Sequence, residues 1–336
     1  MTIAMLRGIW GTSEELYRSL NRISAMSFRL GLVFAIFLAA GYAFSQDSSP
    51  HTTLPATSQS PVSRPIDLKP DASGTVPNEQ IRDLLRHAEE KDIENDKQQR
   101  DYTYIERVEQ HKFDGHGAVK KVESHTSEIL QIYGEDVERL TAKDDQPLPP
   151  DEVKKEDDKI QKIIDKHKNE SEEDRRKRLA KEEKDREEDR KFVLEVADAF
   201  NFRLIGSEAI NGRDAWVLEA EPRPEYQPKS REAKILTKFK GRIWIDKITE
   251  QWVKLDITAI DTISVGFVLA RIHKGTHLVM ELTRVNDEVW LPKRIQLHFD
   301  ARVALLKSYD EDVEQTYRDY KKFRADSKIT VIGEQP

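Results

Sequence analysis

The C-terminal half of the chain alternates apolar and polar residues in short runs, and this pattern constrains the fold more than any other feature. Side chains of a β-strand point alternately to opposite faces, so each run predicts a strand with one buried face. Residues 252–260 are the clearest run, with Val253, Leu255, Ile257 and Ala259 on one side and Trp252, Lys254, Asp256 and Thr258 on the other. Further runs predict neighbouring strands at 202–210, 215–220, 241–248, 276–285, 289–299 and 312–320.

Turn residues separate these runs and predict hairpin connections. Asn211-Gly212 stands between two of them, and Asn-Gly is the strongest short hairpin signal. Asn286-Asp287 turns the chain between two later runs. Strands joined by tight turns pair antiparallel, so the fold class that follows is α+β, with one large antiparallel sheet and a few helices.

The N-terminal half predicts further strands. Residues 102–113 and 118–133 alternate aromatic or β-branched residues with polar ones, and the turn residues 114–117 lie between them. We expect a long hairpin there. A third short strand, 137–142, leads into the proline-rich residues 147–150, where pairing ends because proline has no N–H to donate.

Three other segments predict helices or buried structure. Asn78 is a suitable N-cap, and the apolar residues of 78–88 recur at helical spacing, which predicts a short amphipathic helix. Residues 230–236 are compatible with a helical turn. Residues 263–272 are apolar at nearly every position, so we expect a buried helix or strand that lines the core. The functional alternative for this segment is a lid over an apolar cavity.

The tract 151–191 is charged at 31 of its 41 positions, with 16 acidic and 15 basic residues. Such a sequence forms helices through ion pairs between residues three or four apart, each worth only about 0.2 to 0.5 kcal/mol. We expect a solvated helix or pair of helices, and the alternative is an arm that docks a protein partner. Because the two signs cancel, the tract does not indicate nucleic-acid binding.

The N-terminus has the pattern of an export signal. Residues 30–44 are apolar and uncharged, follow Arg29, and precede a tract rich in Ser, Thr and Pro. A helix of this length, at about 1.5 Å per residue, is shorter than the roughly 30 Å core of a bilayer, which favours a cleaved signal over an anchor. Ala43 and Ser45 are the small residues that a signal peptidase accepts before a cut at Gln46.

The expected organisation follows from this pattern. We predict a signal peptide at 1–45, with translation starting at Met26, and a flexible linker at 46–77. A single α+β domain, 78–336, then carries the helical insertion 151–191. The alternative for the N-terminus is an amphipathic stretch before an uncleaved anchor. Either way, we expect an exported protein of the periplasm or cell envelope.

The residues give little sign of catalysis. The chain has no cysteine, which excludes disulfides, thiolate nucleophiles and cysteine zinc clusters, and its net charge of −7 disfavours nucleic acid as a partner. His273 and His277 are four residues apart but flank a predicted turn, and His111, His116 and His125 lie on the first hairpin without metal-ligand spacing. No phosphate-binding loop, nucleophile elbow or dinucleotide fingerprint occurs. We therefore expect no cofactor, no metal and no enzymatic activity, and a hydrolase built from scattered carboxylates and histidines is a minor alternative.

Four segments resemble successive strands of the outer-membrane lipoprotein-sorting superfamily, which includes LolA- and LolB-type carriers and RseB-type sensors. They are NGRDAWVL at 211–218, GRIWID at 241–246, QWVKL at 251–255 and VWLPKR at 289–294. The resemblance covers about 202–323, and 102–148 could supply the opening strands. It implies an incomplete, curved antiparallel barrel whose apolar cavity receives acyl chains. The insertion 151–191 and the lack of an anchoring cysteine distinguish this chain from the membrane-bound members.

The sequence therefore favours a non-enzymatic carrier or binding protein for a lipid or the acyl chain of a lipoprotein. Candidate cavity residues are the aromatic and apolar side chains of the predicted strands, namely Trp216, Trp244, Trp252, Phe267, Leu269 and Trp290. Contact with a membrane would be peripheral unless the signal is retained. The alternative is an envelope interaction or sensor protein that docks its partner through 151–191.

Overall fold

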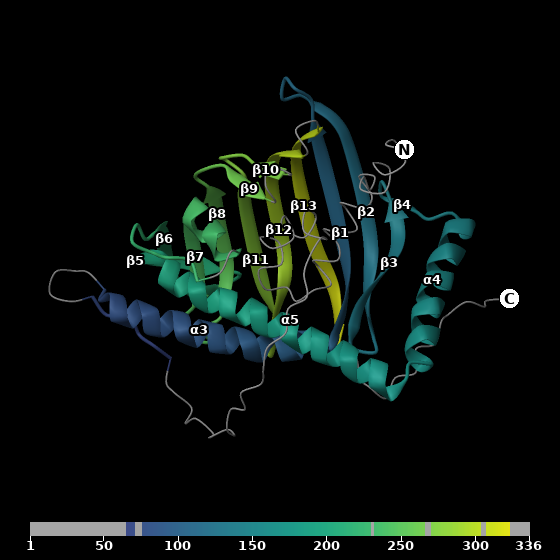
Figure 1. The fold of residues 1–336 in the computed structure, drawn as a ribbon, viewed down its shortest axis with the longest axis horizontal. Helices are drawn as coiled ribbons and strands as arrows, with labels where there is room; N and C mark the ends of the chain where they lie inside the picture. Colours follow the sequence, from purple (N-terminus) through teal and green to yellow (C-terminus); the bar gives the residue numbers. More distant parts are fainter. Residues whose placement is uncertain (1–64, 71–75, 230–231, 266–269, 304–306, 323–336) are drawn as a thin grey trace, which may run out of the picture.

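The alternating runs form one continuous antiparallel sheet. The computed structural model describes residues 65–70, 76–229, 232–265, 270–303 and 307–322. The sheet has 13 strands, ordered from edge to edge β4-β3-β2-β1-β13-β12-β11-β8-β7-β6-β5, with β10 beside β12 and β9 beside β10. Its two edge strands, β4 and β5, do not pair with each other, so the sheet is a curved, open half-barrel (Figure 1). The predicted α+β class is confirmed.

The elements follow the predicted runs closely. The helices are α3 (Asn78–Gln99), α4 (Pro150–Lys168), α5 (Glu172–Ala199) and the 3-10 helix η2 (Glu232–Lys238). The first strands are β1 (Tyr102–Phe113), β2 (Val119–Ile132), β3 (Glu135–Lys143) and β4 (Gln146–Pro147). The central strands are β5 (Phe200–Ile210), β6 (Arg213–Pro222), β7 (Phe239–Asp246), β8 (Trp252–Ala259), β9 (Ile263–Val265) and β10 (Ala270–Ile272). The last are β11 (His277–Val285), β12 (Val289–Val303) and β13 (Lys307–Lys322).

The hairpin turns form where the sequence predicts them. Asn211 and Gly212 join β5 to β6 with φ of 51° and 78°, and Asn286 and Asp287 join β11 to β12 with φ of 52° and 55°. Two successive residues with positive φ match the twist of paired strands. Asparagine, aspartate and glycine tolerate this conformation best, which is why these residue pairs identify the turns.

One predicted face assignment is wrong, because β8 contains a bulge. Trp244 of β7 pairs with Lys254, but the next residue, Ile245, pairs with Trp252 and skips Val253. The extra residue reverses the alternation at the start of the strand. Trp252 therefore lies on the same face as Leu255, and Val253 packs with Trp244 in a second cluster, which Trp252 also contacts.

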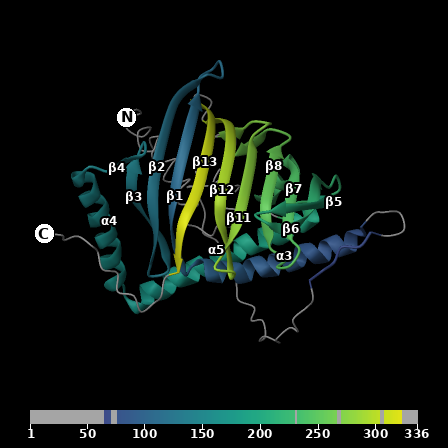
Figure 2. The same cartoon turned by 180° about the vertical axis from the view of Figure 1, so that it is seen from behind.

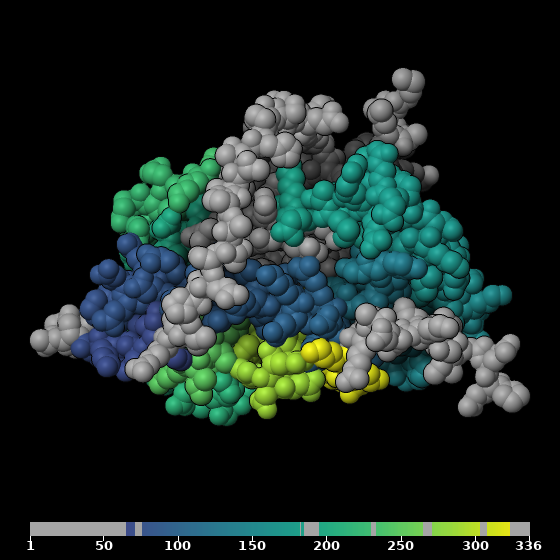
Figure 3. Space-filling view, turned by 90° about the horizontal axis from the view of Figure 1, so that it is seen from below, coloured from purple at the N-terminus to yellow at the C-terminus, as the bar shows by residue number. Residues whose placement is uncertain are grey.

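Helices cover the two faces of the sheet unequally. We call the face that carries α3 and α5 the inner face and the opposite one the outer face. α3 runs along the lower ends of the strands and contacts β12, β5 and α5 (Figures 1 and 3). α4 instead packs on the outer face, where Ile160 contacts Ile132 and Val137. These two side chains point outward because their neighbours along the strands point to the inner face. The turn between α4 and α5 thus passes around the edge of the sheet beside β3 (Figure 2).

The helices differ in two respects from the sequence expectation. α3 extends to Gln99, well beyond residue 88. Its second half buries polar residues that bond to the sheet, so the apolar periodicity that predicts a helix fades there. The charged tract forms a pair of helices as predicted, but α4 is docked on the sheet rather than fully solvated. Of the predicted linker, the described residues Leu68 and Val76 are buried against α3. The predicted signal peptide lies outside the described residues, and Phe267 and Leu269 do as well.

Candidate functional site

The inner face carries an apolar cluster built by strands alone. Its buried members come from five strands, β1, β2, β11, β12 and β13, and half-buried residues of β8, β12 and β13 pack against them. We call this set the inner cluster. It consists of Tyr104, Ile129, Leu278, Met280, Ile295, Leu297 and Tyr317, with Trp252, Leu255, Ile257, Phe299, Val313 and Tyr320 half-buried around them.

The strand register explains why these side chains meet. Leu255 pairs with Met280, and Met280 pairs with Ile295. In the neighbouring row, two residues along each strand, Leu278 pairs with Leu297, and Leu297 pairs with Val313. Directly paired residues of antiparallel strands hold their Cβ atoms about 4.5 to 5.5 Å apart. The rows therefore form a continuous apolar surface across four adjacent strands.

Other parts of the inner face pack against helices. Leu84 and Ala88 of α3 pack against Leu218 and Ile245, and Ala199 of α5 packs beside Phe239. Among the described residues, no helix side chain belongs to the inner cluster. This apolar surface therefore differs from the rest of the same face in having no described helix as its packing partner.

Tyrosines border the inner cluster at β1 and β13. The ring centroid of Tyr104 lies 5.9 Å from that of Tyr317 and 5.4 Å from that of Tyr320. The Tyr317 hydroxyl donates to Gln315 Oε1 at 3.1 Å, and the Tyr320 hydroxyl donates to the carbonyl oxygen of Pro292. Burial raises the pKa of Tyr320 well above its usual value, so the phenol stays neutral. This border is aromatic, and it includes one buried carboxyl, Glu106, which pairs with Tyr317 and also raises the pKa of Tyr320.

Buried hydrogen bonds fix α3 beside the cluster. Asn95 donates to the carbonyl oxygen of Trp290 at 2.8 Å and accepts from its N–H at 2.7 Å, which satisfies both backbone groups of that residue. Asp92 Oδ1 accepts from Gln251 and from the indole of Trp252, both at 3.0 Å. Buried polar groups cost stability unless they are paired, so these bonds hold the helix in one position.

A buried ion pair braces the turn between β7 and β8. Arg213 donates to both carboxylate oxygens of Asp246, at 2.7 and 3.0 Å, and Thr249 donates to the same carboxylate through its N–H at 2.7 Å. Burial raises the pKa of Asp246, but these hydrogen bonds lower it by more, so the net shift is downward. Asp246 therefore stays ionised and supports the turn that positions Trp252.

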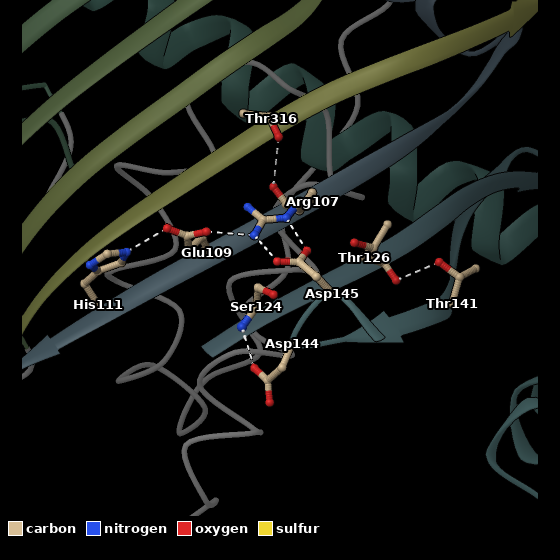
Figure 4. Close-up of polar contacts among 9 residues, drawn as sticks. All are labelled: Arg107, Glu109, His111, Ser124, Thr126, Thr141, Asp144, Asp145 and Thr316. Carbon is tan, nitrogen blue, oxygen red and sulfur yellow. Dashed lines mark hydrogen bonds and ion pairs between the residues drawn. The ribbon is translucent and has the colours of Figure 1, made fainter. Parts of the chain in front are cut away.

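The outer face of β1 has the opposite chemistry to the inner cluster. Arg107 donates to both oxygens of Asp145 at 2.7 Å and to Glu109 at 2.7 Å, and Glu109 lies 2.7 Å from His111 Nε2 (Figure 4). The bonds from His111 and Arg107 lower the pKa of Glu109, and the bonds to Asp145 and Glu109 raise that of Arg107. Lys254 continues the pattern near the other edge, with its ammonium group 3.4 Å from Glu281 and 4.9 Å from the centre of the Trp244 ring.

One carboxyl near the inner face has a strongly perturbed pKa. Asp136 of β3 pairs with Gln131 of β2 and lies near the end of α3. Burial raises its pKa to about 7, although the charge of Arg100 lowers it, and the nearby Asp96 raises it further. Asp136 is therefore partly protonated near neutral pH.

The structure separates the aromatic residues predicted to line the cavity. Trp216 packs under α3, and Trp252 packs against the inner cluster. Trp244 and Trp290 meet in another cluster, with Val217 and Leu282, and Trp252 packs against this cluster as well. Phe267 and Leu269 lie outside the described residues. That these six residues bind a ligand remains a prediction.

Sequence reasoning missed most of the inner cluster. Met280, Ile295 and Leu297 lie in predicted strands, and their alternation was the available signal. Alternation does not identify the neighbouring strand, however, so it cannot show which residues share one surface. Among the described residues, no group of three or more His, Asp or Glu side chains could hold a metal ion, and no helix is long and apolar enough to cross a membrane.

Comparisons with known proteins find likeness in structure alone. No family model matches the sequence, and no curated protein matches it. A putative outer membrane lipoprotein-sorting protein domain from Vibrio parahaemolyticus is 12% identical, with 73% of this chain and 94% of that chain covered and a TM-score of 0.32.

Two further solved structures are similar to the chain. A LolA superfamily protein from Nitrosomonas europaea is 12% identical, with 72% of this chain and 93% of that chain covered and a TM-score of 0.25. A chain of the MucA/MucB complex of Pseudomonas aeruginosa is 11% identical, with 73% and 99% covered and a TM-score of 0.20. The descriptions from Vibrio and Nitrosomonas name the superfamily that the sequence motifs resemble.

Proposed function

We propose that the chain is a non-enzymatic binding protein that holds the apolar chain of a lipid or of an acylated ligand on the inner cluster. The observation that carries this proposal is that every described member of that cluster belongs to a strand. Elsewhere on the inner face a helix packs against the strands, as α3 does through Leu84. An extended hydrocarbon chain would take the equivalent place on the inner cluster.

The chemistry of the surface supports an apolar occupant. The cluster consists of aliphatic and aromatic side chains, and the buried Glu106 lies beside it at Tyr317. Each CH₂ group buried from water contributes about 0.8 kcal/mol, so an acyl chain gains affinity without any catalytic group. The hydroxyls of Tyr317 and Tyr320 already donate within the protein, which leaves the tyrosine rings as the main contact surface.

Export supports the same proposal. Residues 30–44 have the pattern of a secretory signal, and we infer a location in the periplasm or cell envelope. Acyl chains are insoluble in the aqueous phase of that compartment. A protein with an apolar half-barrel surface would keep such a chain in solution.

Displacement of a fluorescent fatty acid tests the proposal. Val313→Trp adds bulk to the inner cluster, and Glu314→Trp adds the same side chain on the opposite face of β13. We expect saturable binding by the wild type and by Glu314→Trp, and at least tenfold weaker binding by Val313→Trp. Absence of saturable binding, or equal binding by the two variants, would contradict the proposal. Native mass spectrometry of protein from an exporting host, followed by lipid extraction, would identify a bound acyl species.

A second candidate function is docking of an envelope protein by the charged arm 151–191. The observation in its favour is that α5 is exposed on nearly all sides between Glu172 and Lys184, and Leu179 there is 46% exposed. A photocrosslinker at Leu179 should capture a defined partner in the exporting host. The same crosslinker at Ile248, which is 69% exposed in the β7–β8 turn, serves as the control. Equal capture at both positions would count against a docking arm.

A further inference from the structure

Three histidines from distant parts of the sequence lie in one row on the outer face. His277 of β11 pairs directly with His298 of β12, and His298 pairs with Asp312 of β13. Asp312 in turn pairs with His111 of β1. These residues alternate along their strands with members of the inner cluster, so their side chains point to the opposite face. We call His277, His298, Asp312 and His111 the histidine row.

Each of the two adjacent imidazoles is held by its own carboxylate. His277 Nε2 lies 2.8 Å from Asp256 Oδ1, and His298 Nδ1 lies 2.8 Å from Asp312 Oδ1. The side chains of His277 and His298 are 42% and 44% exposed, so both rings are accessible from solvent. One nitrogen of each ring therefore bonds to a carboxylate, and the other nitrogen of either ring has no recorded partner among the described residues.

This arrangement is the one that metal-binding histidines use. A histidine that ligates a metal ion usually donates its second ring N–H to a carboxylate, which fixes the ring and makes the free nitrogen a better ligand. Directly paired residues of adjacent strands have Cβ atoms about 4.5 to 5.5 Å apart, so two imidazoles can reach one ion from there. Imidazole nitrogen binds Zn²⁺ at about 2.0 to 2.1 Å and also suits Cu²⁺ and Ni²⁺.

We propose that His277 and His298 form a two-histidine site for a divalent transition metal ion of the zinc class, oriented by Asp256 and Asp312. Because no three ligating side chains stand close enough together among the described residues, the protein supplies two ligands and water completes the coordination. A site of this kind is exchangeable and exposed. It lies on the face opposite the inner cluster, so it is independent of the proposed binding of an apolar chain.

The spacing of histidines along the sequence does not identify this pair. His273 and His277 are close in sequence, but each bonds to a different carboxylate. His273 Nδ1 lies 2.7 Å from Asp300, whereas His277 bonds to Asp256. His298 is distant from His277 along the chain and reaches it only because β11 and β12 form a hairpin. Spacing along the chain therefore could not predict which two histidines share a site.

Zinc binding by the untagged full chain tests the inference. Isothermal titration with ZnCl₂ should show one site in the wild type, and His277→Ala and His298→Ala should each weaken it at least tenfold. His116→Ala is the matched control, because His116 is exposed in the β1–β2 turn, outside the row, and should leave binding unchanged. Equal zinc affinity in the wild type and both row variants would overturn the inference, and so would absence of zinc-dependent heat in the wild type.

A second measurement separates ligation from a change in folding. The thermal midpoint of the wild type should rise with zinc, because a ligand that binds only the folded state stabilises it. The two row variants should unfold at the wild-type temperature without zinc and show no rise with it, since both side chains are exposed. In the wild type, Cu²⁺ electron paramagnetic resonance should show coupling to two imidazole nitrogens. A Cu²⁺ spectrum without nitrogen coupling would overturn the assignment.

Discussion

On β12 and β13 the two faces of the sheet are built from the same strands, yet the inner face there is apolar and the outer face is polar and charged. On β12, Ile295 and Leu297 belong to the inner cluster, whereas Arg294 and Gln296 point outward and are exposed. On β13, Val313 and Tyr317 face inward and Asp312 and Glu314 face outward. The difference teaches that a period of two in the sequence is sufficient to give each face its own chemistry.

The largest expected effect comes from truncating the inner face. Leu297→Ala removes a buried side chain from the centre of the inner cluster, and we expect a loss of about 2 to 5 kcal/mol of unfolding free energy. Gln296→Ala, on the outer face of the same strand, should change it by no more than about 0.5 kcal/mol. Urea denaturation monitored by tryptophan fluorescence measures both. Similar losses in the two variants would break the distinction between the faces.

A smaller effect should follow from loosening the helix that covers part of the inner face. Asn95→Ala leaves the buried N–H of Trp290 without its partner, which costs about 1 to 3 kcal/mol. Glu94→Ala on the exposed side of α3 is the control. Hydrogen exchange at the Trp290 amide should accelerate only in Asn95→Ala. Unchanged exchange there would mean that α3 is held by its apolar contacts alone.

The smallest expected effect concerns Asp136, the buried carboxyl near the inner face. The pKa of Asp136 is about 7 in the folded chain, against about 3.9 in an unfolded one. The folded state therefore binds more protons between these values, and stability falls as pH rises from about 4 to 7. The full shift of about 3 pH units would correspond to about 4 kcal/mol, but because Asp136 is not completely shielded from water we expect a total contribution of about 1 kcal/mol over this pH range.

Asp136→Asn should remove that contribution. Unfolding free energies measured in urea at several pH values between 4.5 and 7.5 should fall less steeply for the variant than for the wild type. Asp151→Asn, an exposed position at the start of α4, is the matched control and should keep the wild-type slope. A wild-type slope in Asp136→Asn would assign the titration to another group.

The sequence predicts the strands of this sheet well but not their neighbours. Alternation and turn residues locate β5 to β8 and β11 to β13, because both are local properties of the chain. The pairing of β1 with β13 joins segments far apart in the sequence, and no pattern in either segment predicts it. The inner cluster and the place of His111 in the histidine row both depend on that pairing, so neither could be assembled from the sequence.

Two local features also escaped prediction for physical reasons. The bulge at Val253 adds one residue to β8 without changing its composition, so Trp252 was assigned to the wrong face. The second half of α3 buries Asp92 and Asn95, whose hydrogen-bond partners lie far along the chain. Polar residues of this kind look solvated in a sequence. The candidate site is therefore least predictable where polar side chains replace apolar ones in the core.

The place of β13 between β1 and β12 has a consequence for how the chain folds. Glu106 of β1 pairs with Tyr317 of β13. β1 therefore cannot complete its backbone hydrogen bonds until β13 has been synthesised. Closing a loop of this length before its contacts form makes folding slow. While β13 is being made, the open edges of β1 and β12 are exposed to pairing with other chains. A holding factor that keeps the chain unfolded until synthesis ends would raise its yield more than one that acts on the finished fold.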